Sequence, residues 1–349
     1  MFLAWNEIKR NKLKFSLIIG VLILISYLLF LLSGLAKGLI NMNTEAISKW
    51  NADAIVLNRD ANQTVAQSIF DPDLVEGTFK DAATLKQTAV IASNGKQEEN
   101  ALLFGTAQHT FLIPPLIEGH MFNKANEVVA DQTLRDKGFH IGDTLTLSQT
   151  DETLKIVGFT ESAKYNAAPV LFGSNQTIEN INPMLNQNTT NAVVVKDANW
   201  KQVHIDKDLE IVGIDQFVES LPGYKAQNLT LNFMITFLFI ISATVIGVFL
   251  YVITLQKREL FGVLKAQGFT NGYLARAVMA QTLILALIGT LIGLGLTLVT
   301  GAFLPDAVPI KFEPVILLIF GVVLIIVSLL GSLFSILTIR KIDPLKAIG

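Results

Sequence analysis

The chain has 349 residues, of which 51% are hydrophobic and 16% are charged, with a formal net charge of −2 and a mean hydropathy of +0.49. Ordinary soluble domains carry roughly 25% charged residues, so this composition excludes a simple soluble protein. The absence of cysteine excludes disulfide bonds and cysteine-ligated zinc or iron–sulfur sites.

The chain begins with a basic, aromatic segment, for which we predict an interfacial helix over residues 1–14. Phe2, Trp5 and Ile8 fall on one face of that helix, which suits the lipid headgroup boundary, although an ordinary basic flank is the alternative. The apolar run that follows, 16–36, is the first predicted span. It is longer than the apolar core of a signal peptide, about 7–15 residues, although Gly34-Leu35-Ala36 leaves cleavage as an alternative.

Four stretches lack charged residues and histidine, and each is long enough to cross a membrane. A helix needs about 20 apolar residues to span a hydrocarbon core of about 30 Å. We therefore predict an α-helical membrane protein with four transmembrane helices. The uncharged stretches are 16–36, 229–256, 277–305 and 314–339.

Basic residues flank these stretches unevenly and predict their orientation. Lysine and arginine gather before the first stretch, between the second and third, and after the fourth. The positive-inside rule then places both termini and the central turn in the cytoplasm of a bacterial cell. The predicted segments are an interfacial helix (1–14), transmembrane helix 1 (15–40), an extracytoplasmic domain (41–227), transmembrane helix 2 (228–256), a cytoplasmic coupling turn (257–276), transmembrane helix 3 (277–304), an outer loop (305–313), transmembrane helix 4 (314–339) and a cytoplasmic tail (340–349).

The long polar insertion at 41–227 predicts a mixed α+β domain. It holds 24 of the 29 acidic residues, an acidity that indicates solubility more than cation binding. Helical stalks are expected at both of its ends, reaching Trp50 and starting near Gly223, with a short helix at 132–137 that stops at Gly138. Alternating apolar residues predict strands at 54–57, 88–93, 101–104, 127–130, 144–148, 154–159, 170–172, 191–195 and 210–214.

The central turn between the second and third spans is the strongest candidate for a functional contact. Four apolar residues, Leu260, Phe261, Val263 and Leu264, recur at helical spacing and predict a short amphipathic helix that stops at Gly268. Such a helix at a membrane surface could be moved by a soluble partner, and a basic loop that only fixes topology is the alternative. The candidate coupling residues are Lys257, Arg258, Glu259, Phe261, Leu264 and Lys265.

The rest of the sequence excludes several kinds of chemistry. There is no phosphate-binding G-x-x-x-x-G-K-[ST] motif and no H-E-x-x-H motif, and the four histidines lack the spacing of metal ligands. Spans without ionisable residues argue against an ion-coupled pump, a channel for charged solutes or an intramembrane protease. Small residues allow close helix contacts, either within the bundle or across a homodimer, at Ala243/Gly247, Gly289/Gly293 and Ser328/Ser332.

Three motifs in this layout resemble the MacB/FtsX/LolE class of ABC transporter permeases. The turn 257–268 is similar to the cytoplasmic signature of the class, and Asp343-Pro344 in the tail resembles its closing element. The segments 126–130, 142–145 and 156–159 are similar to the core of the MacB-type outer domain. The resemblance implies that two copies pair as a homodimer in the lipid membrane with two copies of a separate ABC ATPase. That partner would hydrolyse ATP and bind the turn, so this chain is expected not to be an enzyme and to have no nucleic-acid partner.

Within the class, residues 1–14 and 33–39 look most like those of the haem-efflux permeases. Haem would then be the substrate, with no permanently bound cofactor and no metal beyond the haem iron. Tyrosine, methionine and carboxylate side chains can ligate that iron, and a lysine can meet a propionate. The resemblance makes Glu45, Tyr224 and Tyr165, the last expected in a loop of the outer domain, candidate ligands. Met42 and Tyr27 are weaker candidates, and Lys37 is a candidate partner of a propionate.

Each of these residues also has an ordinary structural explanation, such as the enrichment of tyrosine at membrane interfaces. Two other functions therefore stay open. One is export of another amphiphile, such as a peptide, an antibiotic or a lipoprotein. The other is an FtsX-like transmitter of signals across the membrane.

Overall fold

The computed structural model describes residues 12–148, 150–305 and 308–340, and the chain divides into two compact units. The helical unit contains residues up to 39 and from 228 onward, and the β domain contains residues 40–227. Almost all of the predicted interfacial helix (1–14) and cytoplasmic tail (340–349) lies outside the described residues.

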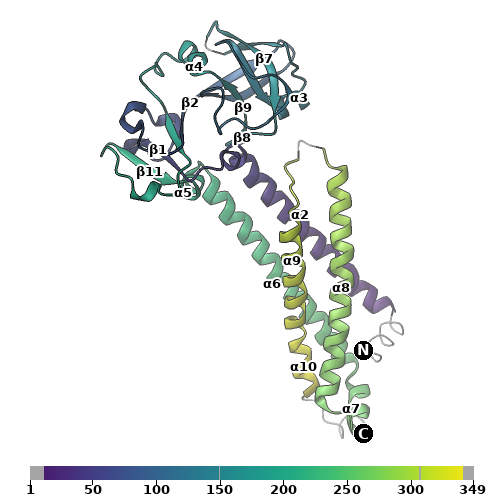
Figure 1. Ribbon diagram of the computed structural model, residues 1–349. Helices are drawn as coiled ribbons and strands as arrows, with labels where there is room; N and C mark the ends of the chain where they lie inside the picture. Colours follow the sequence, from purple (N-terminus) through teal and green to yellow (C-terminus); the bar gives the residue numbers. More distant parts are fainter. Residues whose placement is uncertain (1–11, 149, 306–307, 341–349) are drawn as a thin grey trace. The chain divides into compact units, whose positions relative to one another are not determined.

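The helical unit is built from long apolar helices, as the uncharged stretches predicted (Figure 1). Within the described part of the chain, four helices are long and apolar enough to cross a membrane, and the last of these spans is divided at Ser332 into α9 and α10. The helices with residues in this unit are α2 (Lys12–Trp50), α6 (Tyr224–Gln256), α7 (Arg258–Ala266), α8 (Asn271–Phe303), α9 (Pro314–Gly331) and α10 (Leu333–Arg340).

Small residues pack these helices against one another. Ser26 on α2 donates from Oγ to the carbonyl oxygen of Gly289 at 3.1 Å, and a Cβ at Gly289 would lie 2.5 Å from Leu22. A Cβ at Gly331 would lie 2.6 Å from the carbonyl oxygen of Ala243 on α6. The small-residue positions at 243 and 289 are therefore used for contacts within one chain.

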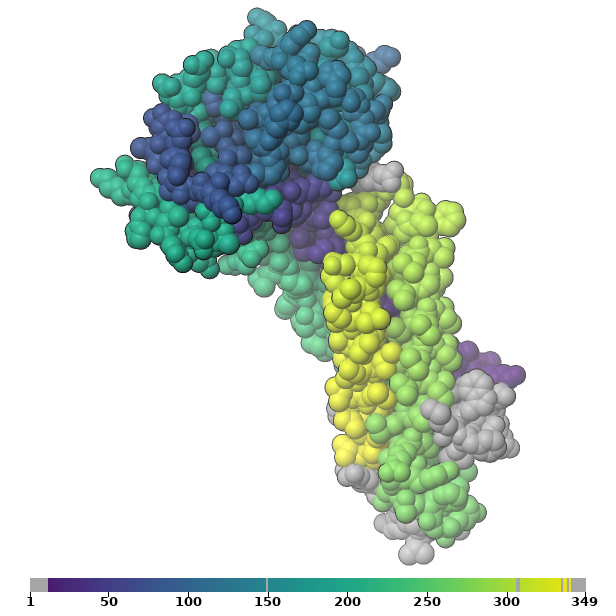
Figure 2. Space-filling view, in the orientation of Figure 1, coloured from purple at the N-terminus to yellow at the C-terminus, as the bar shows by residue number. Residues whose placement is uncertain are grey.

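Large apolar side chains cover the outward surface of the same helices. Figure 2 shows α8 in green and α9 in yellow along the helical unit, and their exposed residues include Leu291, Leu298, Val315 and Leu318. Exposed apolar surface of this extent is what a helix presents to lipid.

The β domain is a mixed α+β fold whose strands follow the predicted pattern. Each predicted strand overlaps a strand of the structure, and the predicted helix at 132–137 is α3 (Gln132–Asp136). The strands are β1 (Ala54–Asn58), β2 (Ala82–Ser93), β3 (Glu98–Gly105), β4 (Leu116–Gly119), β5 (Glu127–Asp131), β6 (Thr144–Leu147), β7 (Thr153–Thr160), β8 (Lys164–Tyr165), β9 (Ala168–Gly173), β10 (Ala192–Val195) and β11 (Leu209–Gly213).

Two strands and two helices were not predicted. β4 and β8 are short, and β4 contains an irregularity between Leu116 and Glu118 that interrupts the alternation of apolar residues. The helices α4 (Asn175–Ile181) and α5 (Ile214–Ser220) have seven residues each, too few to show a helical period clearly.

The strands pair in the order β11-β1-β10-β2-β3-β9-β5-β7-β4, with β6 and β8 off this path. Alternate residues along a strand enter different cores, because successive side chains point to opposite faces of a sheet. In β5, for example, Val129 joins the core around Trp50 and Phe104, whereas Val128 joins the core around Leu134. Trp50, the last residue of α2, is therefore part of the β-domain core.

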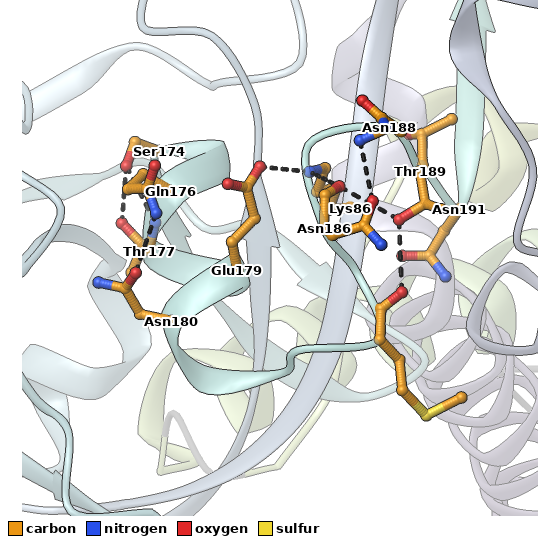
Figure 3. Close-up of polar contacts among 12 residues, drawn as sticks. Lys86, Ser174, Gln176, Thr177, Glu179, Asn180, Asn186, Asn188, Thr189 and Asn191 are labelled. Carbon is orange, nitrogen blue, oxygen red and sulfur yellow. Dashed lines mark hydrogen bonds and ion pairs between the residues drawn. The ribbon is translucent and has the colours of Figure 1, made fainter.

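A buried ion pair lies where the long strand β2 changes partners (Figure 3). Ala82 to Leu85 pair with β10, and from Lys86 onward β2 pairs with β3. Lys86 Nζ lies 2.6 Å from Glu179 Oε1 on α4 and donates to the carbonyl oxygen of Asn186 at 2.8 Å. This polar contact ties α4 and the segment after it to the middle of the sheet.

Candidate functional site

The helical unit contains an apolar cavity of 590 Å³ between α2 and α6. The residues that each helix contributes recur at i, i+3, i+4 and i+7, so they lie on a single face of that helix. The end of α8 and the segment after it complete the lining. The lining residues are Leu28, Leu31, Leu32 and Leu35 of α2, Met234, Phe237, Leu238 and Ile241 of α6, and Thr300, Leu304, Val308 and Ile310.

The chemistry of this cavity suits the apolar part of an amphiphile. Among its described lining residues, Thr300 alone carries a hydroxyl group, and its Oγ1 lies 3.2 Å from the Tyr27 hydroxyl oxygen. Met234 contributes a thioether, a group that can ligate haem iron. The helical period of the two faces was visible in the sequence, but Met234 and Thr300 were not singled out there.

The wall of the cavity after α8 is held tightly against α2. Lys311 donates from its backbone nitrogen to the carbonyl oxygen of Gly34 at 3.0 Å, and a Cβ at Gly34 would lie 2.4 Å from the ring of Phe312. Lys37 Nζ forms an ion pair with Glu313 Oε2 at 3.0 Å, and both side chains are about half exposed. Lys37, predicted to meet a propionate, therefore has a carboxylate partner already.

The predicted coupling helix is α7, and it ends before Gly268, whose φ of +94° stops it. Phe261 is 3% exposed and packs with Leu274, Val278 and Ile339, and Leu264 lies against the same cluster. Phe261 therefore anchors α7, and Leu264 is partly buried beside it. Arg258, Glu259, Leu260 and Val263 are exposed.

Two further coupling candidates, both lysines, contact other helices of the unit. Lys265 Nζ donates to the carbonyl oxygen of Ile339 at 2.7 Å, near the C-terminus of α10, where a cation is favourable. Lys257 Nζ lies 5.3 Å from the centre of the Phe15 ring on α2. These contacts connect α7 to the first and last helices.

The remaining haem-ligand candidates, Glu45, Met42, Tyr165 and Tyr224, belong to the β domain. Tyr165 is 5% exposed, and its ring packs at 6.5 Å from Trp50 and 5.5 Å from Phe104, measured between ring centres. Burial raises the pKa of the Tyr165 phenol far above its ordinary value, which disfavours the tyrosinate that would bind iron. The structure therefore places Tyr165, which was expected in a loop, in the short strand β8 and in the β-domain core.

The other three β-domain candidates are partly buried. Tyr224, the first residue of α6, packs against the same core as Tyr165. The backbone oxygen of Met42 accepts a hydrogen bond from the Ala167 nitrogen at 3.1 Å, and Glu45 accepts hydrogen bonds from Ser162 and Lys164. Within the residues that the structure describes, no group of three or more histidine, aspartate or glutamate side chains could hold a metal ion.

Comparison with known proteins gives full-length relatives. The sequence profile of the family FtsX-like permease C-terminal matches residues 232–344. A protein of Staphylococcus haemolyticus described as a candidate hemin transport system permease, HrtB, is 27% identical over all of this chain and 99% of its own length. Staphylococcus epidermidis proteins with the same description are 28% identical, again over all of this chain and 99% of their own length.

The chain is also similar, at lower sequence identity, to another ABC permease and to a solved periplasmic domain. An uncharacterised ABC transporter permease of Mycobacterium tuberculosis is 22% identical over all of this chain and 99% of its own length. The periplasmic region of MacB from Actinobacillus actinomycetemcomitans aligns with a TM-score of 0.35 and 12% identity, covering 52% of this chain and 97% of that structure. The matched C-terminal helices and the full-length relatives agree with the four spans, and an ABC permease works with a separate ATPase. Residues 232–344 match the FtsX-like permease C-terminal family, and the chain is a non-catalytic, multi-pass permease subunit of an ABC transporter.

Proposed function

We propose that this permease exports haem from the membrane, driven by ATP hydrolysis in its ATPase partner. The observation that carries the choice of haem is the similarity, over the full length, to the staphylococcal proteins described as candidate hemin transport permeases. We further propose that both termini and α7 face the cytoplasm, and that two copies of the chain pair in the membrane.

The apolar cavity supports this proposal because its chemistry suits a porphyrin. Leu28, Met234, Phe237 and Ile241 line the cavity and are each between 43% and 47% exposed, so in a bilayer they would face lipid. A molecule dissolved in the membrane would enter between α2 and α6 without crossing water. A volume of 590 Å³ falls within the range of small-molecule sites, roughly 300–1,000 Å³.

The iron of the haem would need a ligand at this site. Among the described lining residues, Met234 has the atom best suited to that role. Propionates would need water or a cation, and Lys37, although paired with Glu313, lies on α2 just beyond the lining residue Leu35.

The proposal is tested by titrating haemin into the purified full-length chain in lipid nanodiscs and recording the visible absorption spectrum. Leu31→Trp should fill the cavity and weaken binding, and Met234→Leu should change the spectrum while keeping the cavity apolar. Leu291→Trp is the matched control, because Leu291 is 64% exposed on α8 and does not line the cavity.

Deleting the gene should make the bacterium sensitive to haem, and the wild-type chain should restore resistance. A deletion strain that tolerates haem as its parent does would refute the haem assignment. Export of another amphiphile is the second candidate, because an apolar cavity accepts many amphiphiles. It would be supported if Leu31→Trp abolished resistance to such a compound and left haem resistance unchanged.

A further inference from the structure

The segment from Glu161 to Ala167, which leads from β7 through β8 to β9, lies on the last turns of α2 within the β domain. Ser162 donates from Oγ to Glu45 Oε2 at 2.6 Å, and the Lys164 backbone nitrogen donates to the same oxygen at 3.3 Å. Lys49 Nζ, one turn further along α2, lies 3.1 Å from Glu161 Oε2.

The tip of this segment is bonded to the helix backbone itself. Asn166 donates from its backbone nitrogen to the carbonyl oxygen of Asn43 at 3.0 Å, and Ala167 donates to that of Met42 at 3.1 Å. Both residues have positive φ, 49° and 66°, which the tight turn between β8 and β9 requires. Alanine rarely adopts such a backbone, so the surrounding contacts must hold it there.

Buried groups fix the other side of the segment. The Ala163 backbone nitrogen donates to Asp131 Oδ2 at 2.7 Å, and Asp131 is fully buried at the end of β5. The Tyr165 ring stacks on Trp50, the last residue of α2. The segment therefore contacts α2 on one side and the β-domain core on the other.

We propose that residues 161–167 form a clasp that locks the end of α2 into the β domain, with Glu45 as its positioning residue. Both oxygens of Glu45 accept hydrogen bonds, since Asn41 Nδ2 donates to Oε1 at 3.2 Å. Iron binding would compete with these contacts. Because Glu45 and Lys49 lie on the last turns of α2, the clasp ties this end of the helix to β5, β7 and β9 within the β domain. This role holds for any cargo, so it does not rest on the haem proposal.

Hydrogen exchange measured by mass spectrometry on the full-length chain in nanodiscs tests the clasp. Glu45→Ala removes the acceptor, and we expect amide exchange across 162–167 to rise roughly ten-fold or more, as expected for loss of a hydrogen bond to a charged group. Glu45→Gln retains an oxygen that can accept from Ser162 and Lys164, and Tyr165→Phe retains the stacked ring. Glu45→Gln should therefore keep much more of the protection than Glu45→Ala does, and Tyr165→Phe should exchange as the wild type does.

Ser162→Ala removes the donor of the same hydrogen bond and should also raise exchange across 162–167. Agreement between the two variants would show that the effect does not come from misfolding of one of them. The matched control is Glu152→Ala, at an exposed glutamate of the same domain. Unchanged protection in Glu45→Ala, or equal loss of protection in Glu45→Gln and Glu45→Ala, would overturn the clasp.

Haemin absorption on the same samples separates the clasp from the proposed cargo. A Glu45→Gln chain that keeps its amide protection but loses haemin binding would make Glu45 a ligand and overturn its positioning role. A wild-type chain that shows the expected exchange pattern but binds no haemin would contradict the cargo and support the clasp.

Discussion

At the scale of single residues, the ion pair between Lys86 and Glu179 is buried inside the β domain. The side chains of Lys86 and Glu179 are 4% and 11% exposed, whereas those of Arg135 and Glu118 are about half exposed. A buried pair adds little net stability compared with apolar residues, but removing one partner leaves an uncompensated charge in the interior. The two pairs should therefore respond very differently to substitution.

We predict that Glu179→Ala lowers the free energy of unfolding of the β domain by about 3–5 kcal/mol, because Lys86 stays buried without its partner. Denaturant titration of the solubilised chain, followed by tryptophan fluorescence, measures this change, since Trp50 is buried in the β-domain core. Glu118→Ala is the control and should change stability by less than about 1 kcal/mol, as exposed pairs do. Equal effects of the two substitutions would contradict the assignment.

Asp143, which directly precedes β6, predicts that the stability of the β domain depends on pH. Burial would raise the pKa of Asp143, but hydrogen bonds from Asn94 Nδ2 at 2.9 Å and from the His140 backbone nitrogen at 3.0 Å outweigh it, so the pKa lies below its ordinary value of 3.8. The unfolded chain then takes up this proton more readily than the native chain does. Asp143 thus contributes stability above pH 3.8, and that contribution is lost as the pH falls through the lowered value.

The corresponding test compares Asp143→Asn with the wild type by denaturant titration at neutral pH and below pH 3.8. The wild type should lose more stability on acidification than the variant, because only the wild type carries this titrating group. Parallel losses in the two chains would show that Asp143 does not contribute to acid sensitivity.

At the scale of elements, glycine positions decide how closely the helices approach. A Cβ at Gly293 on α8 would overlap Ser26 on α2, whereas a Cβ at Gly295 on the same helix would meet nothing within 4 Å. Gly293 therefore lies at a crowded contact with α2, whereas Gly295 faces open space.

We predict that Gly293→Ala separates α8 from α2 and lowers the thermal stability of the purified chain. Gly295→Ala should leave stability unchanged or raise it slightly, because alanine favours a helix by up to about 1 kcal/mol over glycine. Thermal unfolding in the same detergent checks both substitutions. A Gly293→Ala chain as stable as Gly295→Ala would mean that α2 and α8 are not in contact at this point.

The elements also show what the sequence could predict. Long uncharged runs and alternating strands were visible because their periods extend over many residues, as in α6 and β2. The sequence did not show which element packs against each face of these helices and strands. The sequence grouped Leu260, Phe261 and Val263 as apolar residues of one short helix, but packing against Leu274 and Ile339 buries Phe261 and leaves the other two exposed. Likewise, Tyr165 looked like a loop residue, because only the folded domain brings Trp50 and Phe104 around its ring.

At the scale of the whole molecule, one chain combines four long apolar stretches that lack Asp, Glu, Lys, Arg and His with an acidic domain between the first two of them. Permeation of charged solutes would need charged or histidine side chains within the spans, and the uncharged stretches contain no Asp, Glu, Lys, Arg or His. The arrangement instead fits transmission of movement, with α7 exposing Arg258, Glu259, Leu260 and Val263 for a partner. That mechanism requires α7 and the β domain to be on opposite sides of the membrane.

The natural absence of cysteine makes this requirement directly testable. A single cysteine introduced by Glu152→Cys lies at an exposed position of the β domain, and one introduced by Arg258→Cys lies at an exposed position of α7. A membrane-impermeant maleimide should label position 152 in intact cells and position 258 only after the membrane is opened. We expect this labelling pattern because lysine and arginine are in excess around α7, and such residues are usually retained on the cytoplasmic side. Labelling of position 258 in intact cells, with position 152 protected, would invert the topology, and an ATPase in the cytoplasm could then not reach α7.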